Sequence, residues 1–155
     1  MTARMANPAF TLSTATRPLM DLGAAVKNAG LSPVLIDLVN VRASQINGCS
    51  VCVHMHTRDL RKAGESNERL DTVAAWRDTP FFTDAERAAL ALTEALTRIA
   101  DRPETVSDDI WAAAAEHYDE QQLGTLVLTI GMINLWNRLA ISMRSIHPVS
   151  KPKAA

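Results

Sequence analysis

The chain has two cysteines, Cys49 and Cys52, in the order Cys-Ser-Val-Cys, and His56 follows the second by four residues. Thiols separated by two residues are close enough to form a disulfide, and a neighbouring histidine can generate or stabilise a thiolate. On a helix, which turns about 100° per residue, the three side chains lie within an arc of roughly 60°. A helix start also lowers the pKa of a thiol, because unpaired backbone N–H groups favour the thiolate. The pattern therefore predicts a redox-active dithiol.

A histidine acts best as a base when a carboxylate holds its other ring nitrogen. Two residues are candidates for this role: Asp59, three positions after His56, and Asp37, from the preceding predicted helix. His54 falls on the opposite side of the helix, where we expect a solvated surface residue.

A zinc site is an alternative interpretation of the same side chains. Cys49, Cys52 and His56 supply three ligand types, but a structural site needs a fourth, and the remaining candidates are His117, His147 or an acid. Two cysteines that fill the core without chemistry are a further alternative.

Other cysteine chemistries do not fit the sequence. Covalent haem attachment requires a histidine directly after the second cysteine, where this chain has Val53. A thioredoxin-type dithiol requires a βαβ context, for which the sequence shows no strand signals.

The composition is that of one ordinary globular domain: 155 residues, 47% hydrophobic, 21% charged and a formal net charge of −1. A balance so close to neutral gives no reason to expect nucleic acid or a membrane surface as a partner. Residues 1–18 lack the apolar stretch of a secretory signal, and the uncharged run 121–137 is short and interrupted by glycine and asparagine. We therefore expect a cytoplasmic protein, in which a close cysteine pair is more often catalytic or metal-binding than structural.

Helical periodicity and capping residues recur along the whole chain, so the predicted fold is all-α, a single-domain bundle of about six to seven helices. Ser32-Pro33 and Thr83 to Glu86 are typical helix starts, and Gly48 and Gly64 are typical helix ends. The predicted helices cover 18–28, 33–47, 49–64, 66–76 and 83–100, one opened by Ser107, and 119–145. We expect residues 1–17 to form a flexible arm, 18–147 the helical domain and 148–155 a tail.

Residues 35–52 read Leu-Ile-Asp-Leu-Val-Asn-Val-Arg-Ala-Ser-Gln-Ile-Asn-Gly-Cys-Ser-Val-Cys, and His56-Thr57 and Ala63-Gly64-Glu65 follow. This string resembles the core of the AhpD-like alkylhydroperoxidases of the carboxymuconolactone decarboxylase superfamily. The resemblance extends through 75–82 and 86–90 to the segment Ile-Asn-Leu-Trp-Asn-Arg at 133–138, so it covers most of the chain.

The resemblance implies an all-helical fold that assembles into trimers or hexamers, and thiol-dependent reduction of a hydroperoxide substrate. By position, Cys52 corresponds to the thiol that attacks the peroxide, and Cys49 to the partner that donates a proton and then closes the disulfide. His56 corresponds to the relay histidine and Asp37 to the relay glutamate. An external dithiol, not identified by the sequence, would restore the thiols, and no cofactor is expected besides the redox-active disulfide.

Two departures from the family pattern bear on activity. Asp37 is one methylene shorter than the family glutamate, so we expect its contact with His56 to need a water molecule. Val51 stands where well-studied members carry a histidine, which removes a proton-transfer group. The intact cysteine pair argues against a lactone decarboxylase, and a slowly cycling, non-enzymatic redox module remains an alternative.

Aromatic residues outside the dithiol motif are interpreted as structural. For Trp136, with Asn137 and Arg138, we expect packing or an oligomer contact rather than contact with substrate. For Trp76 and the pair Phe81-Phe82, we expect positions in the core.

Overall fold

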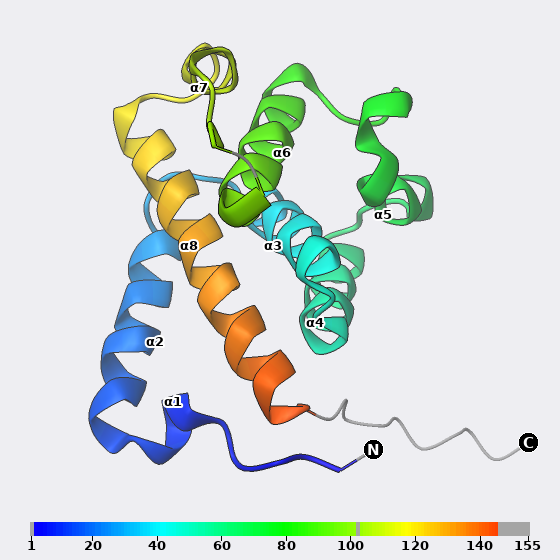
Figure 1. Cartoon of the computed structure of the whole chain (residues 1–155). Helices are drawn as coiled ribbons and strands as arrows, with labels where there is room; N and C mark the ends of the chain where they lie inside the picture. The colour runs from blue at the N-terminus through cyan, green and yellow to red at the C-terminus, as the bar shows by residue number, and fades with distance from the viewer. Residues whose placement is uncertain (1, 102, 146–155) are drawn as a thin grey trace, which may run out of the picture.

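The computed structural model describes residues 2–101 and 103–145, and within them the chain is one all-helical domain without strands. Eight α-helices and two short 3-10 helices account for it (Figure 1). Their bounds are α1 Pro8–Thr11, α2 Ser13–Lys27, α3 Pro33–Asn47, α4 Ser50–Lys62, α5 Asn67–Thr72, η1 Val73–Asp78, α6 Asp84–Thr97, η2 Ile99–Asp101, α7 Asp108–Ala115 and α8 Glu120–Met143. The all-α prediction is confirmed.

The capping residues set the ends of the helices as the sequence predicts. The Ser32 side chain accepts a hydrogen bond from the backbone N–H of Leu35 at the start of α3, where Pro33 occupies the first helical position. At the other end, Gly48 adopts the left-handed conformation with φ 74°, which costs a residue without a Cβ little. Thr83 and Glu86 form the predicted capping box at the start of α6.

The N-terminal segment differs from the predicted flexible arm over 1–17. Asn7 caps α1, and α2 begins at Ser13, so Pro18 lies inside the helix rather than at its start. The segment before α1 is tied to the end of α8, because the backbone N–H of Arg4 donates to the carbonyl oxygen of Met143 at 2.9 Å. The predicted tail 148–155 lies outside the described residues.

The helix α8 is the central element of the domain. It crosses between α2 on one side and α3 on the other, and α3 in turn packs against α4 and α6 (Figure 1). By length and composition α8 could cross a membrane. The glycines and asparagines that interrupt its apolar run predict instead that it does not span one. In this fold it carries buried polar side chains that hydrogen-bond within the domain, namely Thr125, Thr129, Asn134 and Asn137.

A buried carboxylate on α6 joins this helix to α3 and to the 3-10 helix η1. Glu94 accepts hydrogen bonds from the Trp76 indole at 2.9 Å, from Arg42 at 2.7 Å and from Arg77 at 2.6 Å. Burial raises the pKa of Glu94, but these three hydrogen bonds outweigh it and hold the pKa below its ordinary value. Trp76 is therefore a core residue, as expected.

The two phenylalanines that follow Trp76 in the sequence differ in burial. Phe82 is buried as predicted, whereas Phe81 is exposed and not part of the core.

Candidate active site

The cysteine pair lies at the turn between α3 and α4. Gly48 ends α3, the backbone N–H of Cys49 donates back to the carbonyl oxygen of Ser44, and Cys49 then caps α4. Cys52 follows in the first turn of α4, and the two Cα atoms are 5.4 Å apart, joined by a disulfide. Both residues are buried, at 2% and 5% exposure, against Ala43 and Ile133. The local sequence thus holds two sulfur atoms at bonding distance at a helix start.

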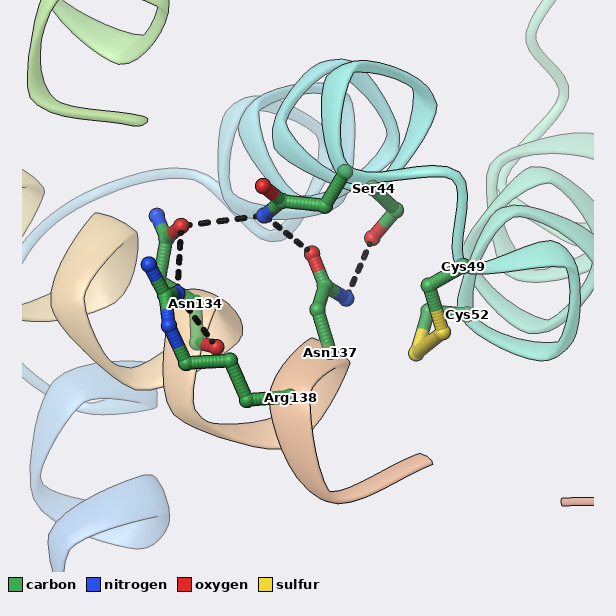
Figure 2. Close-up of a disulfide and its surroundings, with 7 residues drawn as sticks. Ser44, Cys49, Cys52, Asn134, Asn137 and Arg138 are labelled. Atoms are coloured by element: carbon green, nitrogen blue, oxygen red, sulfur yellow. Dashed lines mark hydrogen bonds between the residues drawn. A yellow bond between two sulfur atoms is a disulfide. The ribbon is translucent and has the colours of Figure 1, made fainter. Parts of the chain in front are cut away.

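A network of amides ties this turn to α8 (Figure 2). The Asn47 side chain, at the end of α3, donates to the amide oxygens of both Asn134 and Asn137 at 2.9 Å. Asn137 in turn donates to the Ser44 hydroxyl at 3.0 Å, and Arg138 donates to Asn134 at 3.1 Å. Because Ser44 and Asn137 have no exposed surface, the network fixes the end of α3 and the cysteine turn that follows it.

His56 is paired directly with Asp37. Its Nδ1 lies 2.8 Å from Asp37 Oδ1, with side-chain exposures of 13% and 25%. The prediction that the shorter Asp37 needs a bridging water is therefore wrong, because α3 and α4 pack closely enough for the aspartate to reach. The bond to Nδ1 leaves Nε2 available for proton transfer.

The other candidate carboxylate serves a different purpose. Asp59 bonds to Arg58 and Lys62 of the same helix, each at 3.2 Å. Partial burial raises the pKa of Asp59, but hydrogen bonds from the two basic side chains outweigh it and hold the pKa below its ordinary value. His54 is exposed, as expected.

A cavity of about 450 Å³ opens beside Cys52 and His56. Its walls come from α2, α3, α4 and α8 and are mostly apolar; besides Cys52, His56 and Asn40 they comprise Leu19, Met20, Gly23, Ala24, Val26, Lys27, Ile36, Met55, Met132, Ile133 and Trp136. Cys49 does not line this cavity and borders a separate, smaller hollow near Arg144. The two sulfurs are therefore not equivalent, since only Cys52 faces the cavity that His56 shares.

The cavity includes residues that sequence reasoning missed. Trp136, for which we expected packing or an oligomer contact, forms part of the cavity wall and stacks on Phe10 with ring centroids 6.2 Å apart. The α2 residues belong to no chemical motif, and only the packing of α2 beside α8 brings them to the site. Asn40 lies on α3 within the motif segment, one turn after Asp37, but its residue type gave no separate chemical signal.

The zinc alternative finds no ready site in the described part of the chain, where no three His, Cys, Asp or Glu side chains are grouped to hold a metal ion. His117 lies beside Tyr118 at the other end of the domain, and His147 is outside the described residues. Instead of a metal site, the structure contains a cysteine pair that can alternate between dithiol and disulfide. A histidine held by a carboxylate lies next to it.

The fold is that of the AhpD-like helical proteins. The family model for the "Carboxymuconolactone decarboxylase family" matches residues 14–95, more than half of the sequence. The chain belongs to this family. Among curated proteins it is similar to the uncharacterized protein YdfG of Bacillus subtilis (strain 168), at 40% identity over 125 residues, covering 81% of this chain and 84% of the relative.

Solved structures agree with this assignment. A protein of unknown function from Agrobacterium tumefaciens, ATU0492, with a suggested role in antioxidant defence, superposes with a TM-score of 0.88 at 36% identity, over 96% of this chain and all of the other. The debrominase Bmp8 superposes with a TM-score of 0.76 at 16% identity, over 90% and 74% of the two chains. The second likeness concerns the fold alone, and a shared fold does not by itself assign an activity.

Proposed function

We propose that this protein is a thiol-dependent peroxidase of the alkylhydroperoxidase type, which cycles between the Cys49–Cys52 dithiol and disulfide. The observation that carries the proposal is the shared cavity: Cys52, at a helix start, and His56, held by Asp37, both line it. A nucleophile and a base oriented by a third group are the recurring signature of an activated thiol.

The reaction assigns a separate role to each side chain. His56 takes the Cys52 proton through Nε2, and the Cys52 thiolate attacks the hydroxyl-bearing oxygen of the hydroperoxide. The O–O bond breaks, Cys52 becomes a sulfenic acid, and the alkoxide takes the proton to leave as an alcohol. The Cys49 thiol then displaces water from the sulfenic acid and closes the disulfide.

Reduction completes the cycle. An external dithiol attacks the Cys49–Cys52 disulfide, forms a mixed disulfide and closes its own ring, which leaves both cysteines reduced. Asp37 acts through His56 as a positioning residue, fixing the ring so that Nε2 remains free.

The cavity also supports a substrate class. Its apolar walls, with Trp136 and three methionines, favour an organic hydroperoxide over hydrogen peroxide, because an apolar substituent gains from leaving water. We place the reaction in the cytoplasm, where thiols are kept reduced.

Self-association is part of the proposal. Apolar side chains remain exposed along α8 and the N-terminal helices, namely Phe10, Leu12, Met20, Leu22, Leu128, Leu135 and Ile141. So much exposed apolar surface on adjoining helices is typical of an interface. We propose a homo-oligomer, a trimer or a hexamer, that buries part of this surface.

Turnover with a supplied dithiol tests the enzyme against its alternatives. Reduced protein is mixed with dihydrolipoamide and cumene hydroperoxide, and peroxide loss is followed for many equivalents per subunit. We expect continuous consumption by the wild type, none above background for Cys52→Ser, and a fall of about 10²-fold or more for His56→Gln.

His54→Gln, an exposed histidine on the same helix, is the matched control and keeps the wild-type rate. Consumption of only one equivalent per subunit would instead identify a non-enzymatic redox module. Undiminished activity of Cys52→Ser would refute the peroxidase.

A further inference from the structure

Asn40 is a buried amide on the wall of the cavity, and the catalytic scheme above does not use it. Only 6% of the residue is exposed, and its Oδ1 has no hydrogen-bond partner among the described residues. It is the one buried side-chain oxygen or nitrogen there without a partner. Buried amides are nearly always paired, so an exception of this kind calls for an explanation.

The position of Asn40 on α3 relates it to both reacting groups. It lies one turn after Asp37, which holds His56, and one turn before Ala43, which packs against the cysteine pair. All three of Asn40, Cys52 and His56 line the same cavity, whose other walls are apolar except for Lys27 at its exposed edge. Among the uncharged side chains of the wall other than the thiol and the imidazole, the Asn40 amide is therefore the one that offers an oxygen acceptor as well as a donor, since the Trp136 indole can only donate.

We propose that Asn40 binds the –OOH group of the substrate and presents it to Cys52; this inference rests on the peroxidase function proposed above. The hydroperoxide O–H donates to Asn40 Oδ1, and the amide N–H₂ donates to the oxygen that carries the alkyl group. A half-turn of the amide about its last torsion exchanges oxygen and nitrogen, so either can face the cavity.

The amide also matches the negative charge that develops when the Cys52 thiolate attacks the hydroperoxide. The thiolate attacks the hydroxyl-bearing oxygen, the O–O electron pair goes to the alkyl-bearing oxygen, and the N–H₂ of Asn40 stabilises the negative charge that develops there. The proton that His56 took from Cys52 then neutralises the alkoxide. A hydroperoxide has one donor and two acceptor oxygens, and an amide matches both kinds.

A structural role for Asn40 and a role in substrate binding predict opposite effects of its substitution on the stability of the protein. An amide that bonds within the fold destabilises the protein when it is lost, whereas an unpaired buried amide that serves a ligand can be replaced by an apolar group of similar shape without loss. Asn40→Leu is that replacement. Asn40→Ala, which adds no bulk, is the second variant.

The experiment compares two reactions of the same thiol in reduced, full-length protein. Stopped-flow mixing with cumene hydroperoxide gives the rate constant of disulfide formation, and mixing with iodoacetamide gives the rate constant of Cys52 alkylation. We expect both variants to lose about tenfold or more with the hydroperoxide, to stay within about twofold in alkylation, and to keep or raise the melting temperature. Asn67→Leu, an exposed asparagine on α5, is the control and keeps both rates.

Two results would overturn the inference. If the Asn40 variants react with the hydroperoxide at the wild-type rate, the amide does not touch the substrate. If both rates and the melting temperature fall together, Asn40 is a structural residue. Failure of the proposed function is distinguishable, because then the wild type itself forms no disulfide with the hydroperoxide, and the inference fails with it.

Discussion

Replacing Asn137 by alanine should destabilise the protein through the turn that carries the cysteines. Asn137 has no exposed surface, accepts a hydrogen bond from Asn47 at 2.9 Å and donates one to Ser44 at 3.0 Å. Two hydrogen bonds contribute about 1 kcal/mol each, and the buried Ser44 oxygen loses its donor, so we expect a loss of about 2–4 kcal/mol. For a domain of this size, that loss lowers the melting temperature by roughly 4–16 °C.

Urea unfolding followed by far-ultraviolet circular dichroism measures this loss. The exposed Asn67→Ala is the control and should stay within about 0.5 kcal/mol of the wild type. Ser44→Ala should cost less than Asn137→Ala, and the double variant should cost less than the sum, because both substitutions remove the same bond. An Asn137→Ala protein as stable as the control, or strict additivity with Ser44→Ala, would refute the account of the network.

Three further outcomes follow from the structure. Gly23→Leu, which adds a side chain toward Met132, should lower kcat/KM for cumene hydroperoxide about tenfold while leaving hydrogen peroxide unaffected, as peroxide-consumption assays would show. Because the pKa of Glu94 is lower in the folded than in the unfolded chain, its stabilising effect is present above the ordinary pKa of 4.5 and is lost as the pH falls below it; Glu94→Gln should flatten the acid side of the melting-temperature profile. Leu128→Asp with Leu135→Asp should shift the mass measured by light scattering toward the monomer.

Much of the fold follows from local signals in the sequence. Both ends of α3, the end of α4 and the start of α6 are set by Ser32, Gly48, Gly64 and the capping box at Thr83, each of which acts within one helical turn. The N-terminal helices were misjudged because Pro18 was taken as a helix start, whereas α2 begins five residues earlier without a side-chain cap.

For the site, too, some features could be predicted from the sequence and others could not. The motif from Asp37 to His56 indicated the dithiol and its histidine, because helical spacing places them together. The direct contact of Asp37 with His56 depends on the distance between α3 and α4, which no residue pattern encodes. Gly23 and Trp136 became cavity residues only when α2 and α8 were placed in space. Helical spacing alone places Asn40 one turn after Asp37 on α3, but only the structure shows that it lines the cavity without a hydrogen-bond partner for its oxygen.

A rapid-quench experiment on reduced protein tests the central claim most directly. The protein is mixed with one equivalent of cumene hydroperoxide and quenched with an alkylating reagent, and the intact mass and the peptide that contains Cys49 and Cys52 are measured. We predict a fast loss of two hydrogens that localises to Cys49 and Cys52 and is abolished in Cys52→Ser. Two cysteines that remain fully alkylatable after exposure would contradict the peroxidase cycle.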